Sequence, residues 1–470
     1  MTADPHDAPL DRRPLLFALH FLGGNAAAWS EVALRLAPRC DFVALDLPGF
    51  GDARDATGFA VSAMAAFVAA EIRARAPRRY VLIGHSMGAA VAFAVARIAE
   101  SGAPSLDGLA GMALFSGSPP APEPMNEAKR CEMLGWFAGD AATSRTEAGR
   151  YIDENIATSL DLSVRARTTA GVLQMNRGAW TAWLTAGSRE NWASRIGVLQ
   201  TPALIVAGEL DPALGIDAQA RLTAPHFSCF RLCIIPGVKH LAPLEAPDAV
   251  AALIGDLLEK TAPVEPAIPA AFHALMCTPR VSARTRDVLL ERAEPVRDRD
   301  LLAAAPLATL RAMVDRIVPQ NGPERIDLAA RLTAAIASGP DDGWRFADMP
   351  TDGVALAAGL HALDALARPS AGRGFFALDA CEQDRMLAKA AAGALTPPAP
   401  GLNAAQMKLW FEDVRSAAVR AYIAHPATHA RIGYDGIANR GDGVSPDGFA
   451  AVGLGERETW ETDAVLGVSP

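Results

Sequence analysis

The sequence lacks several features that would assign it to a large functional class. Its apolar runs stay below the roughly 18 residues that a membrane-spanning helix needs, and its six cysteines form no CxxC pair. It has no cluster of His, Cys and Asp at metal-ligand spacing and no phosphate-binding loop. The net charge of −9 has the wrong sign for a nucleic-acid surface. We therefore expect no membrane span, no metal or other cofactor, and no nucleic-acid partner.

The cysteines and the N-terminus bear on the compartment. The cysteines are scattered over the chain, at Cys40, Cys131, Cys229, Cys233, Cys277 and Cys381. We expect them to be reduced thiols in protein cores, which indicates a reducing compartment such as the cytoplasm. The run that starts at Arg12-Arg13 superficially resembles a twin-arginine export signal. Its apolar part ends at His20 without a cleavage site, so we expect a buried strand there instead.

The first 262 residues alternate between short apolar runs and segments of helical length. A chain of 470 residues, half of them hydrophobic, is expected to form two or three domains. Strands separated by helices predict an α/β domain with a mostly parallel sheet and helices on both faces. Ligands bind such sheets beyond the carboxyl ends of the strands. The expected strands are Leu15–Leu19, Phe42–Asp46, Arg79–Ile83, Leu109–Phe115, Thr201–Gly208 and Phe230–Ile235.

The motif Gly84-His85-Ser86-Met87-Gly88 lies between one of these strands and an alanine-rich helix. In this context a serine occupies a sharp turn, and the glycines are needed because neighbouring backbone leaves no room for a Cβ atom. The turn exposes the Ser86 hydroxyl at the helix N-terminus, where negative charge is favoured. We therefore predict that Ser86 is a nucleophile for acyl transfer.

Two further residues at strand ends complete a catalytic triad. A serine needs a base to take its proton, and the base needs a carboxylate to fix its tautomer. His240 follows the sixth expected strand, and Asp211 follows the fifth. Glu209 is a rival for the acid, although it lies nearer the strand.

An oxyanion hole needs two backbone N–H groups that point to one place. Met87 supplies one of them, and Leu22, in the loop after the first strand, is expected to supply the other. We expect His20 to brace this loop and to border the substrate pocket. His85 is expected to pack beneath the turn.

Residues 119–195 interrupt the alternation, and we expect them to form a helical cap over the site. The expected helices are Met125–Phe137, Thr143–Ile156, Leu162–Asn176 and Ala179–Leu184. Large apolar side chains in this segment either line a substrate pocket or only pack the cap onto the core. These side chains are Trp136, Met133, Met175, Trp180 and Trp183, and His20, outside the segment, is a further candidate for the pocket.

Residues 14–262 resemble the serine branch of the α/β-hydrolase superfamily. The resemblance rests on residues 20–24, 46–51, 84–88, 208–211 and 236–240. It implies hydrolysis of a carboxylic ester or lactone through an acyl-enzyme, with a core at residues 1–118 and 196–262 around the cap at 119–195. The resemblance also implies a sheet of eight strands. In this chain we expect about six, because the first two-stranded ribbon of the family has no counterpart. Serine at position 86 sets the chain apart from branches with an aspartate nucleophile.

A proline-rich stretch at residues 263–270 is typical of a semi-rigid linker. Beyond it, helical spacing replaces the strand pattern, so residues 271–470 are expected to form a separate, mainly α-helical domain. His425 and His429 are four residues apart, but Pro426 interrupts the helix, which argues against a zinc pair. The expected helices are Leu307–Val318, Asp327–Ser338, Gly353–Leu366, Asp379–Ala392 and Ala404–Ile423.

This C-terminal domain resembles the small, third subunit of gluconate 2-dehydrogenase. The similar pieces are residues 310–319, 359–364, 376–378 and 425–433. The resemblance implies a non-catalytic domain that binds a flavin-dependent dehydrogenase subunit. Such subunits usually carry an export signal, so the resemblance leaves the periplasm open as an alternative location. It also leaves open a second function, that of a non-catalytic small subunit or assembly factor of a dehydrogenase complex.

Overall fold

The computed structural model describes residues 13–456, apart from 78, 107, 138, 297–300, 322–323, 339–347, 372–373, 399, 439, 444–452 and 454–455. Residues 1–12, expected to be polar and loosely packed, lie outside the described residues. So does most of the glycine-rich stretch near residue 450. The chain divides into two compact units. The first comprises Met1–Ala262, Ala303–Thr309 and Ala367–Leu378, and the second comprises Pro263–Leu302, Leu310–Leu366 and Asp379–Pro470.

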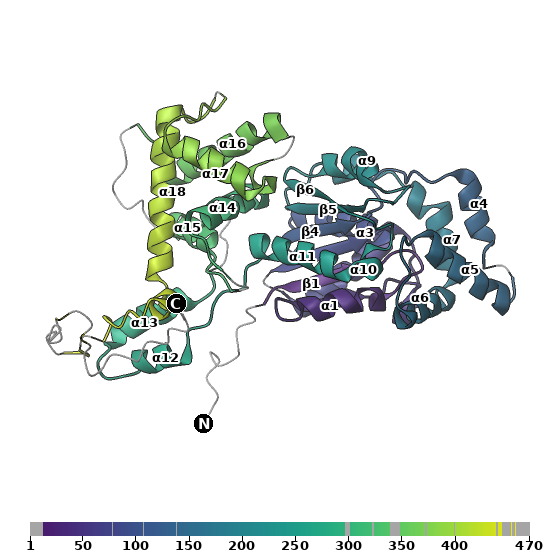
Figure 1. Cartoon of the computed structure of the whole chain (residues 1–470), viewed down its shortest axis with the longest axis horizontal. Helices are drawn as coiled ribbons and strands as arrows, with labels where there is room; N and C mark the ends of the chain where they lie inside the picture. The colour runs from purple at the N-terminus through teal and green to yellow at the C-terminus, as the bar shows by residue number, and fades with distance from the viewer. Residues whose placement is uncertain are drawn as a thin grey trace. The chain divides into compact units, whose positions relative to one another are not determined.

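In the described residues, the first unit contains one parallel sheet of six strands in the order β2-β1-β3-β4-β5-β6 (Figure 1). The strands are β1 (Leu15–Leu19), β2 (Asp41–Leu45), β3 (Tyr80–His85), β4 (Leu109–Phe115), β5 (Ala203–Gly208) and β6 (Phe230–Ile235). Leu19, the last residue of β1, pairs with Leu45 on one side and Gly84 on the other. Because the strand order reverses at β1, a crevice for ligands is expected between the ends of β1 and β3.

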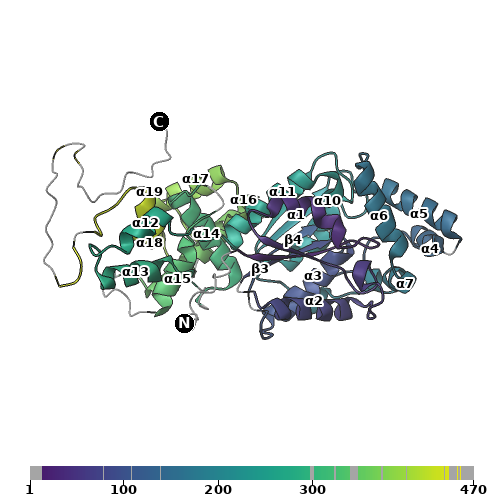
Figure 2. The ribbon, with the colours of Figure 1, turned by 90° about the horizontal axis from the view of Figure 1, so that it is seen from below.

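Helices cover both faces of this sheet (Figure 2). On one side, α1 (Ser30–Leu36) packs against α11 (Pro247–Thr261), and on the other α2 (Val61–Arg75) packs against α3 (Met87–Glu100). The four central strands are buried almost throughout because both their faces meet helices. This confirms the α/β sheet with helices on both faces.

The edge strand β6 is less buried than the sequence suggests. Only Ile235, at its end, is fully buried. A segment from far along the chain lies against this strand: the 3₁₀ turn Phe375–Ala377 contacts β6, and Arg368 donates a hydrogen bond to the carbonyl oxygen of Ser228 (3.0 Å). The sequence pattern predicts that these later residues belong to the C-terminal domain, whereas the structure groups them with the sheet.

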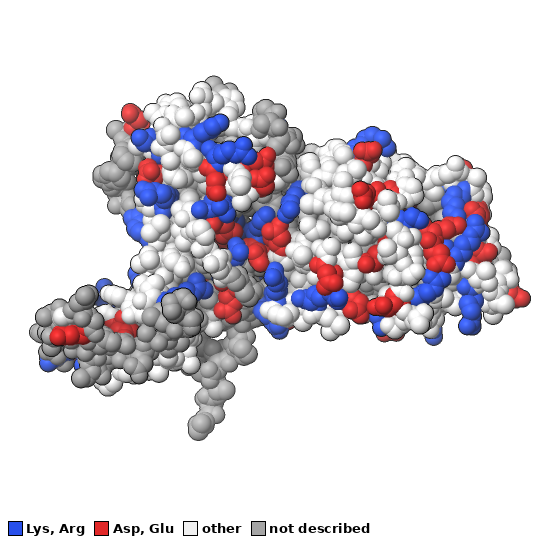
Figure 3. Space-filling model, in the orientation of Figure 1, with Lys and Arg blue, Asp and Glu red and all other residues white. Residues whose placement is uncertain are grey.

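Four helices form the expected cap at one end of the sheet (Figure 1). Three of them begin with an Asn or Asp whose side chain accepts a hydrogen bond from the first turn, which explains where they start. On the face shown in Figure 3, acidic and basic side chains are intermixed over the cap, in keeping with the ion pairs between α4 and α5. The cap helices are α4 (Glu127–Gly135), α5 (Ala141–Glu154), α6 (Leu162–Gln174) and α7 (Arg177–Thr185).

The second unit is helical in its described part, as expected. Three helices that the sequence analysis did not identify are α12 (Ala270–Met276), α13 (Ala283–Ala293) and α19 (Pro426–Arg431). The interruption at Pro426 is confirmed, because α18 ends at Ala424 and His425 caps α19. The other helices are α14 (Ala304–Ile317), α15 (Leu328–Ser338), α16 (Asp352–Ala371), α17 (Ala380–Ala391) and α18 (Ala404–Ala424).

The proline-rich stretch at 263–270 is anchored within the second unit. Val264 forms a β-bridge with Glu324, and the buried Glu265 pairs with Arg331 at 3.3 Å and accepts a hydrogen bond from the N–H of Asp327 at 3.1 Å. At least its first residues are therefore part of the folded unit.

Among the described residues, no helix has both the length and the apolar character required to cross a bilayer. The expectation that the cysteines lie in protein cores holds for Cys40 and Cys229, which are buried, whereas Cys233 is only partly buried. It is wrong for Cys131, Cys277 and Cys381, which are exposed.

Two Arg–Asp pairs that both start on α14 provide a test of this helical unit. Arg311 and Asp327 pair at 2.8 Å with side chains 7% and 3% exposed, whereas Arg316 and Asp384 pair at 2.7 Å with side chains 32% and 50% exposed. Removing one partner of a buried pair leaves an uncompensated charge, so we expect Asp327→Ala to destabilise the unit by about 3 kcal/mol or more. The matched control Asp384→Ala should cost at most about 1 kcal/mol.

The measurement is native-state hydrogen exchange of the α14 and α15 amides. Equal losses of protection in the two variants would contradict the importance of the buried pair.

Candidate active site

The turn after β3 holds Ser86 in a strained conformation. Its φ of 51° and ψ of −120° are unusual for a residue with a side chain. A Cβ atom on Gly84 would lie 2.5 Å from the Cα of Ala89, and one on Gly88 would lie 2.6 Å from the carbonyl oxygen of Leu19. Both glycines are therefore required by the closeness of neighbouring backbone, as the motif suggests.

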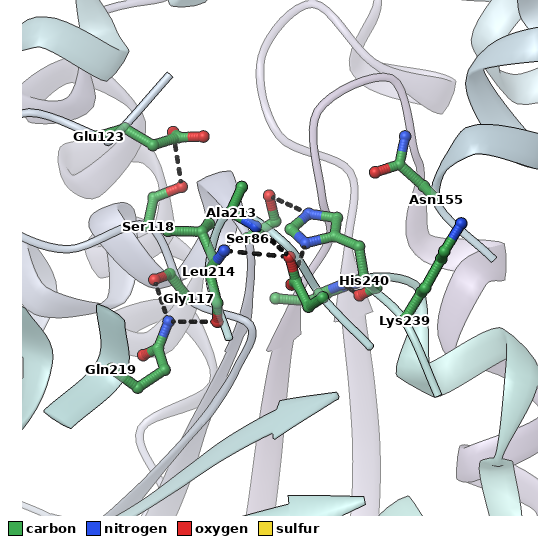
Figure 4. A network of polar contacts seen from close by, with 12 residues as sticks. Ser86, Gly117, Ser118, Glu123, Asn155, Ala213, Leu214, Gln219, Lys239 and His240 are labelled. Carbon is green, nitrogen blue, oxygen red and sulfur yellow. Dashed lines mark hydrogen bonds and ion pairs between the residues drawn. The ribbon is translucent and has the colours of Figure 1, made fainter. Parts of the chain in front are cut away.

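The structure brings Ser86, His240 and Asp211 together, and Figure 4 shows the first two side by side. The Ser86 hydroxyl lies 2.9 Å from His240 Nε2, and His240 Nδ1 lies 2.8 Å from Asp211 Oδ2. Since the carboxylate can only accept, Nδ1–H donates to Asp211 and Nε2 is left to accept the serine proton. This is the arrangement that activates a serine.

The acid in contact with His240 is Asp211 rather than Glu209. Asp211 is buried, and its Oδ1 accepts hydrogen bonds from the N–H groups of Ala213 (3.1 Å) and Leu214 (3.0 Å). Glu209 is exposed and accepts a hydrogen bond from the N–H of Gly237 at 2.8 Å. Asp211 is thus held rigidly by the turn that follows β5.

The environment adjusts the pKa of both partners. Burial disfavours the charged form of Asp211, but the charge and hydrogen bond of His240 outweigh it, so the pKa of Asp211 falls well below its usual value. Burial likewise opposes protonation of His240, but the Asp211 carboxylate prevails and raises the pKa of His240. An imidazolium that forms during reaction is therefore stabilised.

His20 braces the loop that carries Leu22. Its Nδ1–H donates to the carbonyl oxygen of Phe21 (2.8 Å), and its Nε2 accepts from the N–H of Leu47 (3.1 Å). Burial lowers the pKa of His20 to about 4, which keeps it neutral and fits this tautomer. The carbonyl of Phe21 and the N–H of Leu22 belong to one peptide plane, so His20 also fixes the direction of that N–H.

Among the hydrogen bonds of the described residues, none uses the N–H of Leu22 or of Met87. Both N–H groups are at the ends of the neighbouring strands β1 and β3, where the expected oxyanion hole would lie. Met87 is also the first residue of α3, whose N-terminal N–H groups favour negative charge.

His85 supports His240 from beneath. Its Nε2–H donates to the carbonyl oxygen of His240 at 2.7 Å, and the two rings lie 5.4 Å apart. Burial lowers the pKa of His85 to about 3, so the ring is neutral. The location beneath the turn agrees with the expectation from the sequence.

The cap also holds the site, through contacts that the sequence analysis missed. The carbonyl oxygen of Asn155 accepts hydrogen bonds from the N–H groups of His240 and Leu241, both at 3.1 Å. Glu245 also links the cap to the loop of His240. One of its carboxylate oxygens accepts a hydrogen bond from the N–H of Ala157 in the cap (2.6 Å), and the other accepts one from the N–H of Lys239 beside His240 (3.0 Å).

A third cap contact reaches the oxyanion loop. The Tyr151 hydroxyl donates to the carbonyl oxygen of Leu22 at 2.8 Å. Like the contacts of Asn155 and Glu245, it joins residues far apart in the sequence, so no local pattern marks it. The cap thus fixes both the base and the loop that carries the second oxyanion donor.

The apolar residues proposed for the pocket are buried in the core that the cap shares with the sheet. Trp180 lies against Gly23 in the oxyanion loop, and its indole N–H donates to the carbonyl oxygen of Met133 at 3.0 Å. Trp136 packs on Trp180, with ring centroids 6.2 Å apart, whereas Trp183 lies against Gly187. A pocket role for Trp136, Met175, Trp180 and Trp183 stays a prediction.

Comparison with known proteins assigns the larger part of the chain. Residues 16–253, about half of the chain, match the family model described as alpha/beta hydrolase family. The chain belongs to this family. Residues 304–441 match a second model, described as gluconate 2-dehydrogenase subunit 3. Both matches agree with the resemblances in the sequence.

Individual relatives match over shorter segments. The chain is 35% identical over 101 residues to a pimeloyl-(acyl-carrier protein) methyl ester esterase of Pectobacterium carotovorum, which covers 22% of this chain and 38% of the relative. It is 34% identical over 107 residues to a 2-succinyl-6-hydroxy-2,4-cyclohexadiene-1-carboxylate synthase of Serratia proteamaculans, covering 23% and 40%. The matched segments span about two fifths of these relatives.

Solved structures are similar over the hydrolase half. An esterase from Exiguobacterium antarcticum is 15% identical, with a TM-score of 0.46, and the match covers 52% of this chain and 91% of that one. An esterase from Thermogutta terrifontis is 23% identical, with a TM-score of 0.42 and coverage of 53% and 90%.

The described residues contain no group of three or more His, Cys, Asp or Glu side chains that could hold a metal ion. The chemistry that the arrangement supports is nucleophilic attack by Ser86.

We expect a fluorophosphonate probe to label this serine. The labelling rate should increase with pH, with a midpoint above the ordinary histidine pKa of about 6.5, because the reaction needs neutral His240 and Asp211 raises its pKa.

The measurement is the pH profile of labelling followed by mass spectrometry. Ser86→Ala and His240→Ala are expected to abolish it. Labelling at another serine, or a midpoint well below 6.5, would contradict this account of the site.

Proposed function

We propose that the chain is a serine hydrolase that cleaves carboxylic esters or lactones through an acyl-enzyme. The contact that supports this best is the hydrogen-bonded series from Ser86 through His240 to Asp211. Membership of the alpha/beta hydrolase family and the short matches to an ester-cleaving relative support hydrolysis as the reaction class.

In this mechanism Ser86 Oγ attacks the acyl carbonyl while its proton passes to His240 Nε2. The N–H groups of Leu22 and Met87 bind the oxyanion, and Asp211 stabilises the imidazolium. His240 then returns the proton to the leaving alcohol. A water molecule, activated in turn by His240, attacks the acyl-enzyme, and the acid is released.

Substitution of the triad provides the main test. We expect Ser86→Ala to lower the turnover of a simple aryl ester by about 10⁴-fold or more. Asp211→Asn should lower it by about 10⁴-fold because the imidazole loses its orientation. The control Glu209→Gln removes the rival acid and is expected to leave turnover close to that of the unmodified protein.

These rates are measured by steady-state hydrolysis. Retained activity in Ser86→Ala would refute the proposal, and a larger loss in Glu209→Gln than in Asp211→Asn would exchange the roles of the two acids.

The brace at His20 has a separate kinetic signature. His20→Ala removes the hydrogen bond that fixes the Leu22 peptide, so we expect kcat to fall by about 10²-fold, the order seen when one oxyanion donor is lost. KM should change little, because the donor acts mainly on the transition state. A change confined to KM would place His20 in substrate binding instead.

For the C-terminal domain we propose binding to a flavin-dependent dehydrogenase subunit. The support is the match of residues 304–441 to gluconate 2-dehydrogenase subunit 3. Such dehydrogenases oxidise sugars and polyols, and some of their products are lactones, so a tethered lactonase would act at high local concentration. Co-purification with a flavoprotein tests the partner, and turnover of sugar lactones relative to aryl esters tests the substrate.

A second candidate function is that of a non-catalytic small subunit or assembly factor, which the same match favours. Fluorophosphonate labelling separates the two, because only an activated serine reacts.

We also propose a cytoplasmic location, because exposed thiols such as Cys131, Cys277 and Cys381 stay reduced in a reducing compartment. Binding to a periplasmic dehydrogenase would favour the alternative location.

A further inference from the structure

A second carboxylate is linked to the segment of Ser86 through hydrogen bonds. The N–H of Ser118 donates to the carbonyl oxygen of Ser86 at 3.0 Å, and the Ser118 hydroxyl donates to Glu123 Oε2 at 3.1 Å. Glu123 is therefore connected to the backbone of Ser86 through one buried serine (Figure 4). Glu123 was not a candidate in the sequence analysis.

The backbone around Glu123 fixes where its side chain can reach. The N–H of Glu123 donates to the carbonyl oxygen of Ser188 at 2.8 Å, and three residues earlier the carbonyl of Pro120 accepts from the N–H of Trp192 at 2.6 Å. The segment that leaves β4 is thus tied to the end of the cap. The backbone of Glu123 is therefore fixed by the cap, and its carboxylate is held by Ser118.

The environment of this carboxylate is poor in compensating charge. Burial raises the pKa of Glu123, although the charges of His240 and Arg130 act in the opposite direction. Arg130 directs its hydrogen bonds to Glu127, to the carbonyl oxygen of Leu184 and to the Ser188 hydroxyl. Glu123 in turn contributes to the raised pKa of His240, so the two groups lie within electrostatic reach.

The second oxygen of Glu123 is available to a ligand. Among the contacts of the described residues, the Glu123 side chain has one hydrogen bond, the one from Ser118. In Figure 4 the other oxygen points away from Ser118, toward the side where Ser86 and His240 are drawn. Glu123 is only partly buried, so this oxygen can be reached from outside, and a carboxylate oxygen accepts more than one hydrogen bond. A hydrogen-bond donor on a substrate could therefore bind to it.

We propose that Glu123 selects substrates that present a hydrogen-bond donor, a hydroxyl or ammonium group, next to the reacting ester, and that it disfavours substrates with an anionic group at that place. This inference rests on the proposed hydrolase function. Glu123 takes no part in proton transfer in this account and acts as a specificity-determining residue.

The test compares kcat/KM at pH 8 for four small esters. Ethyl butyrate is the plain ester, ethyl 3-hydroxybutyrate carries a hydroxyl on the acyl side, 2-hydroxyethyl butyrate carries one on the alcohol side, and monoethyl succinate carries an anion. In Glu123→Gln, we expect the preference for at least one hydroxy ester over the plain ester to fall about tenfold, as for loss of a hydrogen bond to a charged group. Relative turnover of monoethyl succinate should rise.

Two controls keep the result interpretable. Glu71→Gln removes a surface carboxylate that pairs with Arg75 on α2, and it should leave all ratios unchanged. An unaltered rate of fluorophosphonate labelling on the high-pH plateau, where His240 is neutral in both proteins, shows that the Glu123→Gln site is intact. If the ratios stay unchanged in Glu123→Gln while Ser86→Ala is inactive, the inference about Glu123 fails alone. If Ser86→Ala remains active, the proposed function itself fails.

Discussion

The site depends on two places where the backbone leaves no room for a Cβ atom. At Gly84 the turn folds back onto α3, and at Gly88 the helix meets the last carbonyl group of β1. The second approach sets the distance between the start of α3 and the loop after β1. A side chain at position 88 would therefore push apart the segments that carry Leu22 and Met87, the two proposed oxyanion donors. Close packing of the backbone at Gly84 and Gly88 thus fixes the geometry of the turn around Ser86.

A second constraint joins the cap to the catalytic residues. The loop of His240 is held through main-chain hydrogen bonds to Asn155, and Glu245 reinforces that junction. Tyr151 performs the same task on the opposite side, at the carbonyl oxygen of Leu22. The cap therefore holds the loops of His240 and Leu22, the proposed base and oxyanion donor, in addition to its place at the end of the sheet. A movement of the cap near Asn155 would displace the loop of His240.

The features that the sequence predicts well are those encoded by neighbouring residues. The strands, the glycine turn around Ser86, and the order of Asp211 and His240 at strand ends follow from local patterns. Contacts between distant segments leave no such pattern. Glu123 illustrates this, because its link to the nucleophile passes through Ser118 and its backbone is fixed by Ser188. The helices α12 and α19, of seven and six residues, are too short to show a helical period in the sequence.

The cover over β6 has a consequence for biosynthesis. The strand ends at Ile235, but the turn at Phe375–Ala377 that packs against it is made about 140 residues later. During translation β6 therefore lacks this contact until most of the polypeptide has emerged from the ribosome, and an outer strand without its neighbours can pair with other nascent chains. A gene fragment that ends near residue 262 would omit a turn that the structure groups with the sheet, so the first unit is completed only by residues encoded late in the gene.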